Sequence, residues 1–358
     1  MDDRAQTLTQ LTTPAVVIDL DKVERNIKRH QDYANAHGLK LRPHIKTHKL
    51  PRIAEMQLRA GAIGITCQKV SEAEAMVAGT PEIKDVLITY NILGAEKLER
   101  LAVLAQKVRL SVVADNKTVV AGLSRRFAGE AKPLAVLVEC DTGAHRCGVA
   151  TPEDAAALAQ VIAASPGLTF GGLMTYPLPD GAAAVQDFMT RAKALIEAKG
   201  IAVPVITSGG TPSMAKAGDA PVTTEYRAGT YVYNDRSLVA RGTCTWDDCA
   251  LTVLATVVSV PAANRAIIDA GSKTLTSDLL GLQGYGHLLG RDDIRIDQLS
   301  EEHGRLMSDG PIGLKVGDQV RVVPNHACVV TNMVDQVYLT RAGDVIATAP
   351  VVARGRVT

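Results

Sequence analysis

The sequence predicts an α/β protein in which a (β/α)8 TIM barrel is followed by a smaller, mainly antiparallel β domain. Over the first two-thirds of the 358 residues, short β-branched apolar runs alternate with segments of helical periodicity. Continuous apolar strands joined through helices are typical of a parallel sheet covered by helices. After Arg241 the helical periodicity fades, and short strand candidates separated by Gly, Asp and Pro turns take over.

Nine apolar runs in the first part are strand candidates. They are AVVIDL (15–20), LKLRPHI (39–45), IGITC (63–67), DVLITY (85–90), VRLSVVA (108–114), LAVLVEC (134–140), LTFGGLMTY (168–176), VPVITS (203–208) and TYVY (230–233). Eight strands close a barrel of this type, so one run would be left over. A doubly wound open sheet is the alternative, but such sheets usually carry a glycine fingerprint after the first strand, and AVVIDLDKVERN has no glycine.

The helical segments between these runs carry their own end signals. The segment DKVERNIKRHQDYANAHG, for example, ends at Gly38, a residue type that commonly terminates helices. We therefore assign residues 14–241 to the barrel and residues 242–358 to the β domain, with residues 1–13 as a segment that could pack with the second domain.

Composition and charge limit the classes of function. The formal net charge is +1, which gives no electrostatic basis for a nucleic-acid or membrane partner. The opening MDDRAQTLTQ is polar, and no apolar run approaches ~18 residues, so we expect a cytoplasmic protein. The six cysteines follow no CxxC pattern and are expected to be reduced thiols, with one metal ligand possible among them.

The stretch RPHIKTHK (42–49) holds five cationic or titratable side chains in eight residues. Such a cluster suits a solvated turn, a nucleic-acid contact, a metal site or a reacting amine. Catalytic residues of barrels come from the carboxyl ends of strands, and Lys46 and His48 directly follow the second strand candidate. This position favours a reacting amine without excluding a solvated charge.

Two glycine-containing loops follow later strand candidates, SGGT at 208–211 and RAGT at 227–230. Small residues let backbone N–H groups approach an anion closely, so a phosphate site is one interpretation and an ordinary turn is the other. An amine at one strand end and a phosphate loop at another are what a pyridoxal phosphate (PLP) enzyme needs, because its cofactor forms a Schiff base at one end and is held by its phosphate.

The later segment PNHACVVTNMVD (324–335) places His326 and Cys328 two residues apart. On a strand, this spacing points both side chains to the same face. Imidazole with thiolate suits zinc, while a structural histidine beside a core cysteine is the alternative interpretation.

Seven motifs in order, spread from about residue 13 to the C-terminal region, resemble one known family. They are TPAVVIDLDKVERNI, RPHIKTHK, CQKVSEAE, DTGAHRCGV, SGGTPS, RAGTYV and PNHAC. The chain resembles the D-threonine aldolase and D-serine dehydratase group, the metal-activated members of the alanine-racemase-like (fold type III) PLP enzymes. The resemblance implies a PLP-binding barrel with a C-terminal β domain, and a homodimer with active sites near the subunit interface.

The resemblance also implies a role for each matched residue. Lys46 would bond the cofactor, Arg146 would hydrogen-bond its phenolate oxygen, and the strand-end Tyr176 would complete the catalytic set. The metal ligands would be His326 and Cys328, holding a divalent ion such as zinc or manganese. The other cofactor-binding residues would be Gln68, Ser208, Gly209, Gly210, Thr211, Gly229, Thr230 and Tyr231.

The family divides into aldolases and dehydratases, and this sequence carries marks of both. Asn332 and Asp335 keep the aldolase spacing after the metal histidine. Cys328 in the second ligand position is a dehydratase mark, and so is the PLPDG that replaces a His-Gly loop after Tyr176, which leaves the general base unassigned. Two further residues resemble family positions without a definite role, Lys273 and His303.

We therefore predict a PLP- and metal-dependent lyase that cleaves a small β-hydroxy-D-amino acid, most similar to D-threonine aldolase, into glycine and an aldehyde. A D-serine or 3-hydroxy-D-aspartate dehydratase is the first alternative. A non-catalytic PLP-binding protein is a further alternative, against which the metal pair and the full-length β domain argue. An amino-acid racemase is another, and it would need a second acid/base on the β domain and no metal.

Overall fold

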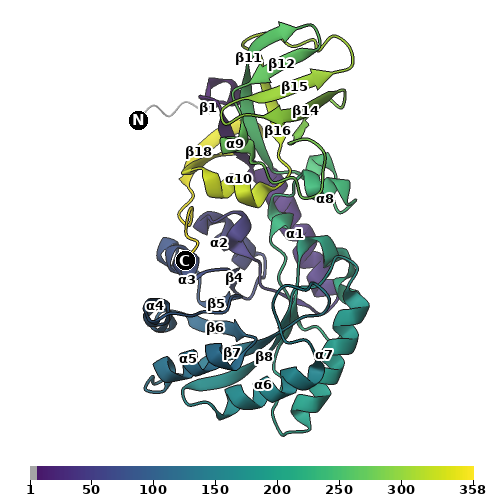
Figure 1. Cartoon of the computed structure of the whole chain (residues 1–358). Helices are drawn as coiled ribbons and strands as arrows, with labels where there is room; N and C mark the ends of the chain where they lie inside the picture. The colour runs from purple at the N-terminus through teal and green to yellow at the C-terminus, as the bar shows by residue number, and fades with distance from the viewer. Residues whose placement is uncertain (1–5) are drawn as a thin grey trace. The chain divides into compact units, whose positions relative to one another are not determined.

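The computed structural model describes residues 6–358, which divide into two compact units. The barrel unit comprises residues 29–46, 51–229 and 356–358. The β unit comprises the segments up to Lys28, Thr47–Leu50 and Thr230–Gly355. Figure 1 shows the chain with many of its helices and strands labelled.

Eight parallel strands form the sheet of the barrel unit, in the order β3-β10-β9-β8-β7-β6-β5-β4. Their bounds are β3 Lys40–Leu41, β4 Ile65–Cys67, β5 Asp85–Ile88, β6 Arg109–Ala114, β7 Leu134–Cys140, β8 Leu168–Thr175, β9 Ile206–Ser208 and β10 Glu225–Tyr226. Backbone hydrogen bonds from Ile63 to Leu41 and from Thr66 to Pro43 join the chain around β3 to that around β4. The predicted eight-stranded barrel is thereby confirmed.

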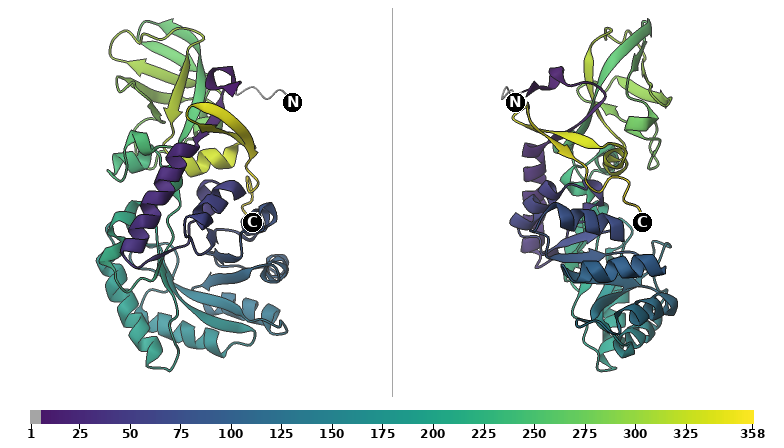
Figure 2. Two further views of the ribbon diagram at one scale, coloured as in Figure 1. Left: turned by 180° about the vertical axis from the view of Figure 1, so that it is seen from behind. Right: turned by 90° about the vertical axis from the view of Figure 1, so that its left-hand side faces the viewer.

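Helices alternate with these strands and cover the outside of the sheet (Figure 2). They are α2 Pro51–Arg59, α3 Val70–Gly79, α4 Ala95–Ala105, α5 Lys117–Phe127, α6 Pro152–Ala164 and α7 Ala182–Glu197, and α1 Leu20–Ala36 precedes them. Side-chain caps start two of them: the Asn116 side chain accepts from the Val119 N–H, and the Thr151 side chain from the Asp154 N–H. Inside the barrel unit, buried side chains of β5 to β8 pack together: Leu87, Val113, Leu137 and Met174.

The β unit is built on a ten-stranded, mainly antiparallel sheet. Its strands are β1 Gln6–Thr7, β2 Ala15–Asp19, β11 Leu251–Ala262, β12 Arg265–Ile268, β13 His287–Leu288, β14 Ile294–Leu299, β15 Gly304–Ser308, β16 Gln319–Val323, β17 Gln336–Arg341 and β18 Asp344–Pro350. Three short helices accompany it, α8 Arg236–Ala240, α9 Ser272–Leu275 and α10 Ala327–Met333. This confirms the second part of the predicted fold class.

Two of the nine strand candidates lie elsewhere than expected. AVVIDL contains β2, which pairs antiparallel with β11 and parallel with β17 in the β unit. TYVY is not a strand: Thr230–Val232 is a turn of 3-10 helix in the β unit. The last barrel strand is instead β10, two residues in a polar segment, which pairs with β3 and β9.

The compact units also differ from the contiguous ranges 14–241 and 242–358. The barrel unit begins after Lys28 and ends its main segment at Gly229, because the first strand belongs to the other sheet. Residues 1–13 were expected to pack with the β domain. Within this segment, β1 pairs with β18 of the β unit, while residues 1–5 lie outside the described residues. Within residues 6–358, no helix combines the length and the apolar character needed to cross a membrane.

Candidate active site

The RPHIKTHK stretch contains two lysines with opposite surroundings. From Leu41 to Leu50, Lys46 is the one exposed side chain, and it lies in the short 3-10 turn Ile45–Thr47 that follows β3. Lys49 is buried, and its Nζ donates to the Ala353 carbonyl at 3.1 Å. The amine of Lys49 is thus used inside the β unit, whereas the exposed amine belongs to Lys46.

A hydrogen-bonded chain connects Lys46 to Gln68 within the barrel unit. The Lys46 N–H donates to Nδ1 of His44 at 3.4 Å, and His44 Nε2 donates to Gln68 Oε1 at 3.1 Å. The amide of Gln68 donates in turn to the Thr89 carbonyl at 2.9 Å, while the Glu72 carboxylate accepts from the Gln68 N–H at 2.7 Å. These bonds fix Gln68 beside the strand end that carries Lys46.

Arg146 and Tyr176 come from the loops after β7 and β8. The Arg146 guanidinium lies 4.7 Å from the centre of the Tyr176 ring, within cation–π range. The loop that carries Arg146 is shaped by Asp141, whose carboxylate accepts from the N–H groups of Gly143 and His145. The structure therefore brings together two of the three residues expected to be catalytic.

The loop after β9 requires glycine. A Cβ at Gly209 would lie 2.7 Å from the Arg227 backbone nitrogen. At Gly210, where φ is +152°, a Cβ would lie 3.3 Å from the Tyr176 ring. Ser208 ends β9, and Thr211 begins a 3-10 helix, Thr211–Asp219. This bare backbone next to Tyr176 fits the close approach of a phosphate group.

The second glycine loop is divided between the two units. Gly229 ends the main barrel segment, while Thr230 and Tyr231 belong to the β unit. There Tyr231 is buried, and Thr230 Oγ1 lies 3.6 Å from Cys328 Sγ. Thr230 therefore contacts an expected metal ligand.

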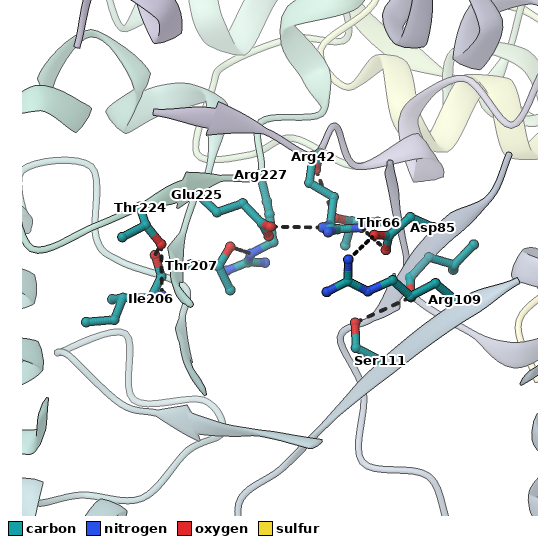
Figure 3. A network of polar contacts seen from close by, with 11 residues as sticks. Arg42, Thr66, Asp85, Arg109, Ser111, Ile206, Thr207, Thr224, Glu225 and Arg227 are labelled. Atoms are coloured by element: carbon teal, nitrogen blue, oxygen red, sulfur yellow. Dashed lines mark hydrogen bonds and ion pairs between the residues drawn. The ribbon is translucent and has the colours of Figure 1, made fainter. Parts of the chain in front are cut away.

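Two buried charged residues of the barrel unit were not singled out from the sequence with a role. Arg227 donates through Nε to Thr207 Oγ1 at 2.9 Å (Figure 3) and through Nη2 to the Thr175 carbonyl, and burial lowers its pKa to about 10. Burial raises the pKa of Glu139 to about 7, although Arg146 and Arg227 act in the opposite direction. The sequence signal that could have identified Glu139 is its position as the one charged residue inside the apolar run LAVLVEC.

The raised pKa of Glu139 leads to a prediction about pH. A carboxyl group that binds its proton more tightly in the folded than in the unfolded chain destabilises the fold as pH rises from about 4.5 to about 7. Glu139→Gln should therefore gain stability relative to the wild type over this interval, by up to about 3 kcal/mol. Urea unfolding at pH 5 and pH 8 measures this gain; an equal difference at both values would contradict the assignment.

The expected metal pair lies at the start of α10 rather than on a strand, so the strand geometry expected for it was wrong. His326 directly precedes the helix, and Cys328 is in its first turn. Burial lowers the pKa of His326, but the adjacent Cys328 and Asp278 outweigh this and raise it to about 9. Among residues 6–358, no group of three or more His, Cys, Asp or Glu side chains is placed to hold a metal ion.

Partners from distant segments of the β unit contact both members of the pair. His326 Nδ1 lies 2.7 Å from Asp278 Oδ2, and Thr47 Oγ1 lies 3.1 Å from Cys328 Sγ. Neither Asp278 nor Thr47 was singled out from the sequence. The available signal for Asp278 was its place in DAGSKTLTSD (269–278), the segment that also contains Lys273.

The four remaining sequence candidates make structural contacts. Lys273 forms exposed ion pairs with Glu301 and Glu302, at 2.9 and 2.8 Å. The His303 backbone carbonyl accepts a hydrogen bond from the Ser300 N–H at 2.9 Å. Asn332 and Asp335 hold the segment before the C-terminus. The Asn332 side chain accepts from the Gly355 N–H at 3.1 Å, and Asp335 pairs with Arg354 at 3.2 Å.

The barrel unit thus carries an exposed lysine after β3, a glycine-lined loop after β9 and an arginine in the loop after β7. Residues 18–237 match the family described as alanine racemase, N-terminal domain. Residues 250–340 match the family described as putative serine dehydratase domain.

Relatives and solved structures agree with these matches. The 3-hydroxy-D-aspartate aldolase of Paracoccus denitrificans (strain Pd 1222) is 35% identical over 97% of this chain and 93% of its own length. The crystal structure of D-threonine aldolase from Filomicrobium marinum superposes with a TM-score of 0.92 at 34% identity, covering 99% of both chains. The D-threo-3-hydroxyaspartate dehydratase from Delftia sp. HT23 has a TM-score of 0.87 at 30% identity, covering 96% of this chain and 98% of its own.

The chain belongs to the alanine-racemase-like family, in the group of D-threonine aldolases and hydroxyaspartate aldolases and dehydratases, and it is an enzyme of the lyase class. PLP is the cofactor that membership of this family implies. A solved structure described as a cysteine-to-alanine mutant of D-threo-3-hydroxyaspartate dehydratase in the metal-free form has a TM-score of 0.88 at 29% identity.

Proposed function

We propose that this protein cleaves β-hydroxy-D-amino acids to glycine and an aldehyde, with PLP and a divalent metal as cofactors. The likeness to aldolases along the whole chain supports the reaction class. The observation that carries the proposal is the exposed Lys46, because a covalently bound carbonyl cofactor needs a primary amine that is accessible and not already hydrogen-bonded inside the fold.

The barrel residues fit the cofactor. Lys46 would bond it, Gln68 and Arg146 would contact its ring, and the loop of Gly209 and Gly210 would receive its phosphate. When bound, PLP supplies an electron-withdrawing ring that stabilises negative charge at the substrate Cα.

Hydrogen bonds within the barrel unit fix the side chains of the proposed cofactor site. The hydrogen bonds of His44 orient Gln68, and Arg227, anchored on Thr207 and Thr175, adds buried positive charge behind the glycine loop. Tyr176 contributes a ring that packs under the Arg146 guanidinium and lies beside Gly210. This ring thereby limits where Arg146 can point.

The donor set of His326 and Cys328 fits a divalent metal of borderline softness, of which zinc is the best example. A bound metal would supply Lewis acidity toward the β-hydroxyl group of the substrate. That a D-threo-3-hydroxyaspartate dehydratase with a cysteine-to-alanine substitution was solved in a metal-free form is in keeping with a cysteine ligand, the role we propose for Cys328. With two protein donors, substrate or water would fill the other ligand positions.

A dehydratase is the second candidate, and two observations favour it. Cys328 occupies the ligand position at which the aldolase pattern has an aspartate, and the loop PLPDG directly after Tyr176 contains no histidine. In addition, Asn332 contacts Gly355 and Asp335 pairs with Arg354, which is a structural role near the C-terminus. The aldolase-like spacing of these two residues is therefore weaker support for an aldolase.

The two candidates are separated by their products. The purified protein, supplied with PLP and with Zn or Mn, is incubated with D-threonine, D-threo-3-hydroxyaspartate and D-serine. We expect glycine with acetaldehyde from D-threonine and glycine with glyoxylate from hydroxyaspartate. Ammonia with a keto acid would establish the dehydratase instead, and absence of any turnover with cofactor bound would overturn both.

A further inference from the structure

Both expected metal ligands have hydrogen-bond partners that belong neither to α10 nor to the PNHAC motif. For His326 the partner is Asp278, which lies 48 residues earlier in the chain. For Cys328 it is Thr47, which lies 281 residues earlier. All four residues belong to the β unit, so these contacts are internal to one compact body.

The carboxylate of Asp278 is itself held in place. Its backbone N–H donates to Thr276 Oγ1 at 3.1 Å, and its Oδ1 accepts from the Leu280 N–H at 3.3 Å. The other oxygen, Oδ2, is then left for His326 Nδ1 at 2.7 Å. A histidine that donates its Nδ1–H to a fixed carboxylate keeps one ring orientation and presents Nε2 as the ligand atom.

Thr47 is fully buried, and its hydroxyl lies 3.1 Å from Cys328 Sγ. Thr230 adds a second, longer contact at 3.6 Å. A hydroxyl group can donate to a thiolate, which stabilises the negative charge and limits the directions in which the sulfur can point. Thr47 directly follows Lys46 in the chain, so the segment that carries the proposed reactive amine also supplies this contact.

We propose that Asp278 and Thr47 are positioning residues of a divalent-metal site at His326 and Cys328. Asp278 fixes the imidazole so that Nε2 faces the metal, and Thr47 steadies the thiolate. The inference rests on the metal in the proposed function, and it names two residues that determine metal affinity without touching the metal. Such outer partners typically contribute 10- to 100-fold to metal affinity.

The test measures metal binding rather than turnover. Holoenzyme containing PLP is stripped of metal and titrated with Co(II), following the sulfur-to-cobalt absorption, and with Zn(II) in competition with a chelator. Asp278→Ala and Thr47→Val should each weaken binding at least about 10-fold. Asp278→Asn and Thr47→Ser keep an acceptor and a hydroxyl group, respectively, and should recover part of the affinity.

Controls separate orientation from folding and from failure of the proposed function. Asp293→Asn removes an exposed carboxylate that pairs with Arg291 in the same unit, and it should leave metal affinity unchanged. Each variant should unfold like the wild type in the absence of metal. Wild-type affinity in both Asp278→Ala and Thr47→Val would overturn the inference while leaving the metal pair intact, whereas a wild type that binds no metal would overturn the metal role as well.

Discussion

Replacement of Lys46 by alanine is expected to lower kcat/KM for D-threonine at least about 10³-fold and to remove the absorbance of the lysine-bound cofactor. The reason is chemical: no other side chain from Leu41 to Leu50 offers an exposed primary amine. Spectra of the purified protein with added PLP, together with initial rates, measure both effects.

Two further variants show whether the primary amine itself is needed. Lys46→Arg keeps the positive charge but cannot bond a carbonyl carbon in the same way, so it should lose as much activity as the alanine variant. Lys49→Gln keeps a donor for the Ala353 carbonyl and should retain the cofactor absorbance. Loss of the absorbance in Lys49→Gln but not in Lys46→Ala would show that the lysine assignment is wrong.

The barrel could be predicted from the sequence because most of its strands are continuous apolar runs separated by helical segments. The exceptions have physical causes. Ala15–Asp19 is buried like a barrel strand, and nothing in its composition indicates that its partners are β11 and β17, more than 230 residues away. Glu225–Tyr226 is too short and too polar to be recognised as a strand, and its pairing with β3 and β9 depends on the closed sheet.

Some residues of the candidate site could be predicted from the sequence and others could not. Lys46 could be singled out from its position after an apolar run, because the parallel strands of a barrel end on one side. The roles of Gln68 and Tyr176 came from the family resemblance. Asp278 and Thr47 could not be named, since each acquires its role through one long-range contact. Within the same motif, the contact with His326 distinguishes Asp278 from Lys273, which pairs only with the exposed carboxylates of Glu301 and Glu302.

The first residue of RPHIKTHK has a structural role that its charge alone does not indicate. Arg42 is buried in the barrel unit, where Nη1 lies 2.6 Å from Asp85 and Nε lies 3.1 Å from Glu225 (Figure 3). Asp85 begins β5 and Glu225 begins β10, so one guanidinium group connects these two strands to the end of β3. Gly64 leaves the necessary space, because a Cβ there would lie 2.6 Å from Arg42 Nη1.

Arg42→Met should therefore lower the free energy of unfolding by about 3–5 kcal/mol, because it removes the ion-pair partner of the buried Glu225 carboxylate and leaves only the weaker interaction of Glu225 with Arg227. The loss of the ion pair with Asp85 should contribute less to this destabilisation, because Asp85 also pairs with Arg109 at 3.7 Å. The double variant Arg42→Met/Glu225→Gln also removes the buried negative charge that has lost its ion-pair partner, and it should recover a large part of the loss. Chemical denaturation of the wild type and the single and double variants measures this coupling. A loss below about 1 kcal/mol in Arg42→Met, or no recovery in the double variant, would mean that side-chain packing rather than the ion pairs holds β3 to its neighbours.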